Sequence, residues 1–279
     1  MSDAPASTDR DTYLAQALSC TACTGMPTNP YYGRPFTPSP RYPTGCGVGV
    51  KSWGSRPKLM IVGQNPPDDP NRALHGAWML HYKGEKYDEL RGPAEQLVSE
   101  VVAYLGLDLS EVYAGQAFRC PTVKNIEPQP NYIQLCAYKH LLPDVRRLRP
   151  EVILSFGHVA DSALSQYGSS PYLDCPVRRE WRVEGRHSRN MTWVRTFRQR
   201  ICTLPIEGLL NLNSEDWSQR DEFYNRPDAD IFERVAAPHP SFARRFLVKD
   251  QWLATIKEAY QHVLGMRAQH EDYFNQQER

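Results

Sequence analysis

The sequence predicts an α/β fold in which helices cover a mostly parallel sheet. Residues 58–63 and 151–157 form short, continuous apolar runs, which are typical of strands buried on both faces. Residues 94–107 and 129–148 lie between these runs and are expected to be helical. Strands that alternate with helices indicate a layered sheet whose ligands bind beyond the carboxyl ends of the strands.

The remaining segments can be assigned in chain order. Residues 1–12 have the composition of a disordered, solvated tail, and residues 25–57 are dense in Pro, Gly and Tyr, which predicts an ordered loop. In the helix 94–107 the apolar side chains of Leu97, Val101 and Leu105 recur at helical spacing. The other expected elements are a strand at 112–118, a helix at 159–167 and an amphipathic helix at 249–266.

Composition limits the classes of function. The chain has 279 residues, 41% of them hydrophobic and 11% aromatic, which suits one large domain. Its 33 basic and 32 acidic side chains nearly cancel, so any surface for nucleic acid must be local. No apolar run approaches the roughly 20 residues that span a bilayer, and the first residues do not follow a signal-peptide pattern. We expect a cytoplasmic protein that is a monomer.

The seven cysteines include four with informative spacing. An odd number of cysteines in such a chain argues against a disulfide framework. Cys20 and Cys23 form a C-x2-C pair, and Cys120 and Cys136 end a strand and enter the next helix. Four converging thiolates suit either a [4Fe-4S] cluster or a structural zinc, and spacing does not choose between them. The alternative is that the pair arose by chance and that the other thiols are small buried hydrophobes.

Two short motifs carry candidate catalytic groups. Gly63-Gln64-Asn65-Pro66-Pro67 follows the first strand, and His239-Pro240-Ser241 lies near the last helix. Each has a plainer interpretation when taken alone. Asn favours turns at strand ends, and a single His is more often structural than catalytic.

Taken with the cysteines, three longer stretches resemble the iron–sulfur branch (family 4) of the uracil-DNA glycosylase superfamily. They begin at GPAEQLVSEVV, EPQPNYIQLC and HPSFARR, and the similarity covers residues 13–165 and 235–264. The resemblance implies a three-layer α/β/α sandwich with a central, mostly parallel four-stranded sheet, in one domain spanning residues 13–279. Relative to the family, the domain has insertions near residues 68–90 and 166–234. The resemblance also implies a structural [4Fe-4S] cluster on Cys20, Cys23, Cys120 and Cys136.

The resemblance further implies hydrolysis of the N-glycosidic bond of a base flipped out of DNA. In this chemistry Asn65 would polarise the attacking water with its amide oxygen, because an amide cannot take up the proton itself. His239 would donate a hydrogen bond to O2 of the departing pyrimidine, where negative charge develops. Neither motif contains a lysine that could form a Schiff base, so the expected enzyme is monofunctional.

The base pocket departs from the family pattern. Gln116 stands where uracil-specific members have the asparagine that reads the uracil edge, and Pro67 replaces a Gly or Tyr near C5 of the pyrimidine. Leu90 occupies the position of the stacking phenylalanine, and the ring is expected instead from Trp78 or a nearby tyrosine, although Trp78 could equally belong to the core. The predicted base-binding residues are therefore Gln64, Pro67, Gln116, Leu90 and Trp78.

Residues after the second motif are expected to contact DNA. The resemblance places them in the groove, where a phenylalanine could act as a wedge and arginines could bind phosphates. The arginine-rich stretch 176–200 could add contacts, or it could be a solvated hairpin that pairs with the acidic segment behind it. The predicted DNA-binding residues are Ser241, Phe242, Arg244 and Arg245.

These departures favour a modified pyrimidine as the substrate, such as the bulky C5-modified cytosines of some phage genomes, and hence a role in antiviral defence. The alternative is a uracil or mismatch DNA glycosylase in base-excision repair. A second alternative is an iron–sulfur protein that binds DNA without catalysis. A third alternative is a nuclease or another metal-dependent hydrolase that uses Asp68, Asp69 and His75. The sequence PDDP is, however, more typical of a turn or a helix cap.

Overall fold

Six strands form one sheet at the centre of the protein, in the order β2-β1-β3-β6-β5-β4. The computed structural model describes residues 19–24, 56–66, 93–122, 127–165, 179–180, 193–201, 230–245 and 248–277. Strands β2, β1, β3 and β6 are parallel, whereas β5 runs antiparallel to β6 and to β4. The strands are β1 (Leu59–Gly63), β2 (Val112–Gln116), β3 (Val152–Phe156), β4 (Arg179–Glu180), β5 (Trp193–Ile201) and β6 (Asp230–Ala237).

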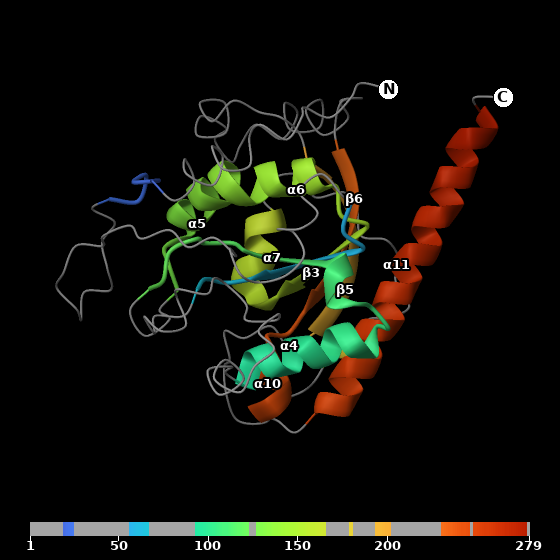
Figure 1. The fold of residues 1–279 in the computed structure, drawn as a ribbon, viewed down its shortest axis with the longest axis horizontal. Coiled ribbons are helices and arrows are strands. Elements are labelled where there is room, and N and C mark those ends of the chain that lie inside the picture. Colours follow the sequence, from blue (N-terminus) through green and yellow to red (C-terminus); the bar gives the residue numbers. More distant parts are fainter. Residues whose placement is uncertain are drawn as a thin grey trace.

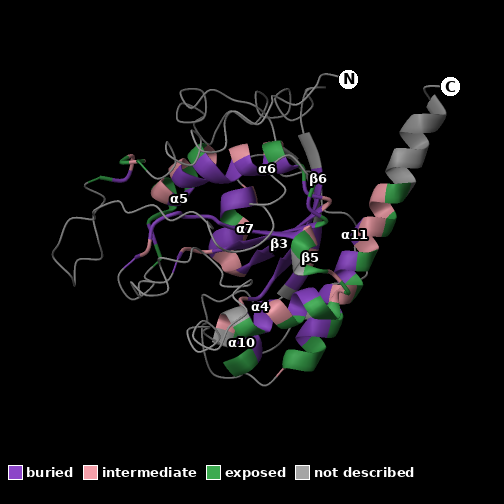
Figure 2. Ribbon diagram, viewed as in Figure 1, coloured by how far each residue is buried: buried purple, intermediate pink, exposed green. Residues whose placement is uncertain are grey.

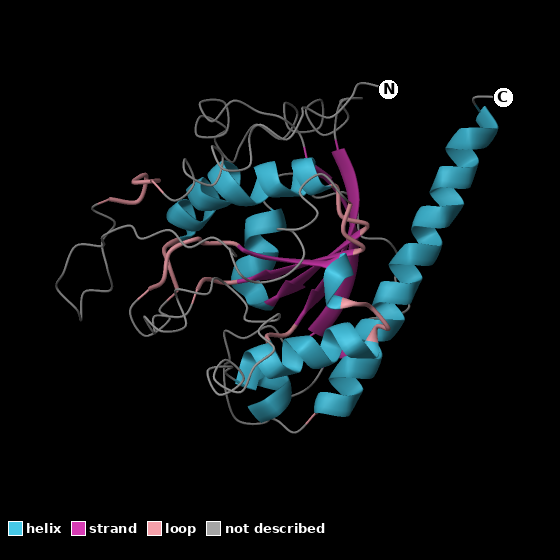
Figure 3. Ribbon diagram, in the orientation of Figure 1, coloured by secondary structure: helices cyan, strands magenta, loops and turns pink. Residues whose placement is uncertain are grey.

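Helices cover both faces of this sheet and make a three-layer sandwich (Figure 1, Figure 3). The first face carries α5, α6 and α7, and the second carries α4, α10 and the long α11. In the part of the chain that the structure describes, no helix combines the length and the apolar character needed to cross a membrane. The helices are α4 (Pro93–Tyr104), α5 (Pro130–Cys136), α6 (Leu142–Leu148), α7 (Gly157–Ser165), α10 (Pro240–Arg245) and α11 (Lys249–Gln277).

The parallel strands are buried on both faces because successive side chains point to opposite helical layers. In β1, Leu59 and Ile61 pack with α4, α10 and α11, whereas Met60 and Val62 pack with α5, α6 and α7. All five residues of the strand are buried, and Figure 2 shows the same for the centre of the sheet. This explains why the sequence of β1 is a continuous apolar run rather than an alternating one.

The predicted fold class is confirmed, and the sheet is larger than expected. The four parallel strands correspond to the predicted four-stranded sheet, and the elements β4 and β5 lie within the predicted insertion at 166–234. Sequence analysis did not identify β5 or β6 as strands. The predicted tail 1–12, residues 25–55 of the predicted loop 25–57, and the insertion near 68–90 lie outside the described residues.

The predicted helix 129–148 is interrupted by a π-helical turn at Ala137–Leu141. The Leu142 N–H donates to the carbonyl of Ala137, five residues earlier, instead of four. Pro143 explains this change, because its ring would collide with the carbonyl of residue 139 in a regular helix and it has no N–H to donate. The turn joins α5, which ends at Cys136, to α6.

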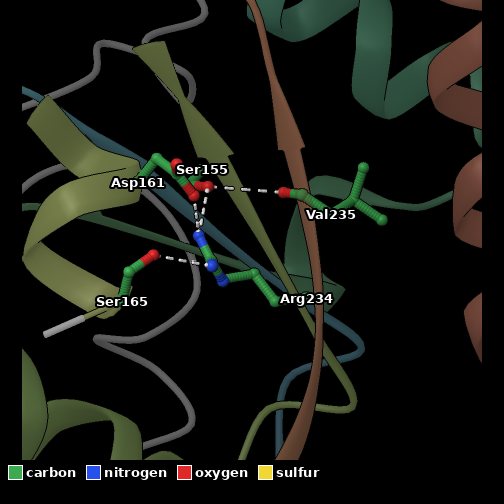
Figure 4. A network of polar contacts seen from close by, with 5 residues as sticks. All are labelled: Ser155, Asp161, Ser165, Arg234 and Val235. Atoms are coloured by element: carbon green, nitrogen blue, oxygen red, sulfur yellow. Dashed lines mark hydrogen bonds and ion pairs between the residues drawn. The ribbon is translucent and has the colours of Figure 1, made fainter. Parts of the chain in front are cut away.

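A buried charge network ties β6 to the neighbouring strand and helix (Figure 4). The Arg234 side chain is 2% exposed and pairs through Nη1 with Asp161 of α7. Its Nη2 donates to Ser165 Oγ at 3.0 Å, and Nη1 lies 3.5 Å from Ser155 Oγ of β3. Burying a guanidinium is tolerated because a carboxylate and two hydroxyls replace its water. The network therefore fixes the positions of β6, β3 and α7 relative to one another.

Replacing Asp161 with Ala should strongly destabilise the protein, because the buried Arg234 guanidinium would lose its carboxylate. We expect the free energy of unfolding to fall by about 3 kcal/mol, measured by urea denaturation. The matched control is Glu100→Ala, which removes a carboxylate from the pair with Lys249, where both side chains are nearly half exposed. That change should cost at most about 1 kcal/mol. Equal losses in the two variants would contradict this account of Arg234.

Candidate active site

The parallel pairing of β1, β3 and β6 brings both predicted catalytic residues to one edge of the sheet. Val62 pairs with Ser155, and Phe156 pairs with Ala237, so Gly63, Phe156 and Ala237 stand at the same level. Asn65 and His239 each follow two residues later, beyond the carboxyl ends of β1 and β6. Only β3 lies between them, which separates the two chain positions by about 10 Å at ordinary strand spacing.

The Asn65 side chain has a defined orientation. Its Nδ2 donates to the carbonyl of Pro66 at 2.9 Å and to Thr122 Oγ1 at 3.1 Å. Both amide protons are thus directed into the protein, and the amide oxygen lies on the opposite side of the group. The backbone of Gln64 is also held, since its carbonyl accepts from the Phe118 N–H at 2.9 Å. Asn65 therefore presents a hydrogen-bond acceptor that could orient water.

The tautomer of His239 follows from its contacts. The backbone N–H of Ser241 donates to Nδ1 at 3.2 Å, and Ser241 Oγ lies 2.8 Å from the same nitrogen. Because a backbone N–H can only donate, Nδ1 is an acceptor and the proton of the neutral ring sits on Nε2. Burial lowers the pKa of His239 from 6.5 to about 4, so the ring is neutral at physiological pH. His239 therefore offers an Nε2–H donor.

The loop that carries His239 is fixed from both sides. Gly157, the first residue after β3, has φ +81°, and a Cβ there would lie 3.5 Å from the His239 Cβ. Only glycine adopts that backbone conformation without strain, so β3 ends in a sharp turn against the His239 loop. On the other side, the fully buried Trp252 donates its indole N–H to the Pro238 carbonyl at 3.2 Å and stacks on Phe156. These contacts position His239.

A second histidine lies between the two motifs. His158 follows Gly157 at the start of α7, directly after β3, the strand that separates β1 from β6. Its Nε2 is 2.8 Å from a carboxylate oxygen of Glu127, and both side chains are 39% exposed. The sequence analysis did not select either residue.

Of the predicted base-binding residues, the structure places Gln64 and Gln116 at this edge. Gln116 is the last residue of β2, is 1% exposed and pairs in register with Gly63, the residue before Gln64. Gln64 is half-buried. Pro67, Trp78 and Leu90 lie outside the described residues, as do Asp68, Asp69 and His75.

Helix α10 divides the predicted DNA-binding residues into two groups. Ser241, Arg244 and Arg245 are exposed and remain available to a nucleic acid. Phe242 is 4% exposed and packs in the core beside α4 and α11, so its side chain does not project as a wedge in this structure. The reason is that α10 is amphipathic, and its short apolar face is needed to cover the sheet.

The four predicted cysteine ligands are free thiols, and three of them belong to one small buried cluster. Cys23, Cys120 and Cys136 are buried together around Phe118, and Cys20 is half-buried beside them. Burial raises the pKa of Cys23 to about 11, with the nearby Cys20 adding to the rise. Burial also raises the pKa of Cys136. A bound cation would favour the thiolate form of these side chains, and four sulfur donors suit either an iron–sulfur cluster or a structural zinc ion.

Arg119 contributes two contacts beside the cysteines, but the cysteines do not form a ready-made metal site. The Arg119 backbone N–H donates to Cys136 Sγ at 3.2 Å, which is the kind of hydrogen bond that stabilises a ligating thiolate. The buried Arg119 guanidinium pairs with Asp144, which also accepts from Tyr113 Oη at 3.0 Å. Among the residues that the structure describes, no three Cys, His, Asp or Glu side chains already stand close enough to hold one metal ion.

Sequence analysis missed Thr122 and Trp252, which contact the two motifs. Thr122 is buried and lies 57 residues from Asn65, and the Trp252 indole reaches back 14 residues to Pro238. Neither has a local sequence signature. One general rule could have pointed to Thr122. The segments that follow two adjacent parallel strands lie at the same edge of the sheet, so residues after β2 are candidates to contact the motif after β1.

Comparison with known proteins agrees with this geometry. The family model for the uracil DNA glycosylase superfamily matches residues 52–261, more than half of the chain, and the chain belongs to that superfamily. The curated type-4 uracil-DNA glycosylase of Archaeoglobus fulgidus is 27% identical over 114 residues. That alignment covers 41% of this chain and 48% of the relative, so the chain matches about half the relative's length.

The low pKa of His239 predicts how stability depends on pH. The His239 side chain takes up a proton near pH 6.5 in the unfolded chain, whereas in the folded protein it does so only near pH 4. Because the unfolded state binds more protons between these values, stability should fall as the pH is lowered from about 6.5 towards 4. The change His239→Gln should remove part of this dependence, seen as a smaller difference between urea midpoints at about pH 7 and about pH 5.

His140 provides the control for that measurement. Its pKa is also lowered to about 4, first by burial and then by the positive charge of Arg119. The variant His239→Gln should therefore keep the part of the pH dependence that belongs to His140. An unchanged difference between the two midpoints in His239→Gln would contradict the lowered pKa and neutral ring of His239.

Proposed function

We propose that this protein is a monofunctional DNA glycosylase that flips a base out of DNA and hydrolyses its N-glycosidic bond. The observation that carries the proposal is the pair of oriented groups, an acceptor on Asn65 and an Nε2–H donor on His239. They follow β1 and β6 at the same edge of the sheet, on either side of β3. Hydrolysis of a glycosidic bond needs one group on each side of the bond.

The reaction follows from the chemistry of these two groups. The Asn65 amide oxygen holds a water whose oxygen bonds to C1′ of the sugar, and the released proton passes to solvent. The C1′–N bond breaks and leaves its electron pair on the base. The Nε2–H of His239 donates a hydrogen bond to the base oxygen where this charge gathers. A neutral imidazole is a weak acid, so His239 stabilises the leaving anion without giving up its own proton.

The substrate we propose is a pyrimidine modified at C5. Support comes from Gln116, which is buried at the end of β2 beside the first motif and is one methylene longer than the asparagine that reads uracil. Pro67 in place of a Gly or Tyr near C5 gives further support. Removal of a bulky modified cytosine from phage DNA would make the protein part of an antiviral defence. Removal of uracil or of a mismatched base would place it in base-excision repair.

We also propose that Cys20, Cys23, Cys120 and Cys136 hold a [4Fe-4S] cluster. The donor set, its burial and the hydrogen bond from Arg119 to Cys136 Sγ favour bound thiolates. The cluster would supply structural cross-linking of the N-terminal segment to β2 and α5, with no part in bond breaking. Arg244 and Arg245 on the exposed face of α10 would bind the phosphates of DNA, and the protein would act as a monomer.

The central prediction is that the protein releases a free base and leaves an abasic site. Duplexes with uracil, mismatched thymine, 5-hydroxymethylcytosine or its glucosylated form should be compared by alkaline cleavage and by chromatography of the released base. We expect release from a C5-modified cytosine. Release from uracil or mismatched thymine alone would favour the repair role, and DNA binding with no base release from any substrate would favour a non-catalytic protein.

Variants of the two motifs provide the controls for that assay. Asn65→Ala and His239→Ala should each lower the single-turnover rate of base release by about 100-fold or more, the usual cost of one transition-state contact. Both should keep the affinity for DNA. Arg245→Ala should instead weaken DNA binding and reduce its salt dependence by about one unit in the log–log slope, with the chemical step unchanged.

The cluster proposal predicts a brown protein with broad absorbance near 400 nm, together with about four iron and four sulfide per chain. Cys136→Ser should lose the colour and most of the iron. Asn65→Ala is the matched control and should keep both. A colourless protein that carries about one zinc per chain would instead indicate a tetrahedral zinc site.

A further inference from the structure

We propose that Thr122 is a positioning residue of the active site, which holds the Asn65 amide so that its oxygen faces the attacking water. This inference rests on the proposed function of Asn65. Thr122 is 5% exposed, and its Oγ1 accepts from Asn65 Nδ2 at 3.1 Å. Thr122 touches neither base nor sugar in this proposal and acts through the amide alone.

Two contacts define the amide, and they have different roles. The Pro66 carbonyl can only accept, so it requires the nitrogen end of the Asn65 amide to face the loop. One such contact leaves the amide plane free to swing about the side-chain torsions. The Thr122 hydroxyl engages the second proton and fixes that plane. Because a misplacement of about 1 Å can cost 100-fold in rate, the plane matters as much as the presence of the amide.

The position of Thr122 is set by the cysteine cluster. Cys120 is buried in that cluster, and only Pro121 stands between it and Thr122. The proline ring restricts the backbone torsion of the linking residue, so the three-residue segment is short and stiff. The segment before it is also fixed, because the backbone N–H groups of Ala117 and Phe118 donate to the carbonyls of Gly63 and Gln64. The sulfur site and the catalytic amide are thus joined through Thr122.

The first experiment compares variants that remove or keep the hydroxyl. Thr122→Val keeps the shape and removes the oxygen, Thr122→Ala removes both, and Thr122→Ser keeps the hydroxyl. We expect the single-turnover rate of base release to fall by about 10- to 100-fold in the first two and to stay within about threefold of wild type in Thr122→Ser. Affinity for substrate DNA and absorbance near 400 nm should be unchanged in all three.

A matched control removes another buried hydroxyl. Thr255 is 3% exposed and its Oγ1 donates to the Gln251 carbonyl within α11. Thr255→Val should leave the rate of base release unchanged. Equal rates in Thr122→Val and wild type would overturn the proposal. So would equal losses in Thr122→Val and Thr255→Val.

A second measurement does not depend on activity. With 15N-labelled asparagine, the side-chain amide signals of Asn65 can be identified by their absence from Asn65→Ala. Thr122→Val should shift these signals, and Thr122→Ser should largely preserve them. If wild type releases no base from any DNA, the glycosylase proposal fails while this measurement still decides the role of Thr122. Unshifted Asn65 signals in Thr122→Val and Thr122→Ala would refute it.

Discussion

The in-register parallel pairing of β1, β3 and β6 is the constraint on which the rest of the molecule depends. It places Asn65 and His239 at one level, although 174 positions separate them in the sequence. A shift of one residue in either ladder would move a motif by about 3.3 Å and send each strand side chain to the opposite helical layer. The helices on both faces prevent such a shift, because each strand side chain already fills a place in one of two cores.

Two buried ion pairs reinforce this register near the motifs. Arg234 and Asp161 join β6 to α7 five residues before His239, and Arg119 and Asp144 join the segment after β2 to α6. Apolar side chains of similar volume could give equal or greater stability. These ion pairs instead restrict how the neighbouring segments can be arranged, since a guanidinium accepts few arrangements of its partners. We regard both pairs as specifying where the neighbouring loops lie.

Much of the fold could be predicted from sequence because β1 and β3 are short, continuous apolar runs, which are typical of strands buried on both faces. Strand β6 was missed for a physical reason. Its Glu233 and Arg234 are charged yet 3% and 1% exposed, so the segment does not look like a buried strand until Asp161, 73 positions away, is known. The motifs identified Asn65 and His239 but not their orientation, which depends on Thr122 and Ser241. The burial of Phe242 likewise depends on packing against helices distant in sequence.

The π-helical turn after Cys136 has a consequence for spacing along the chain. Cys136 and Asp144 both contact Arg119, one through its backbone and the other through its side chain. The extra residue in the turn lets two positions eight apart face the same partner, whereas a regular helix would rotate them apart. In a regular α-helix, positions eight apart differ by about 80° around the helix axis, so without the π-helical turn Asp144 would face away from the side that carries Cys136. The conformation of this segment is therefore as much a part of the site as the identity of its residues.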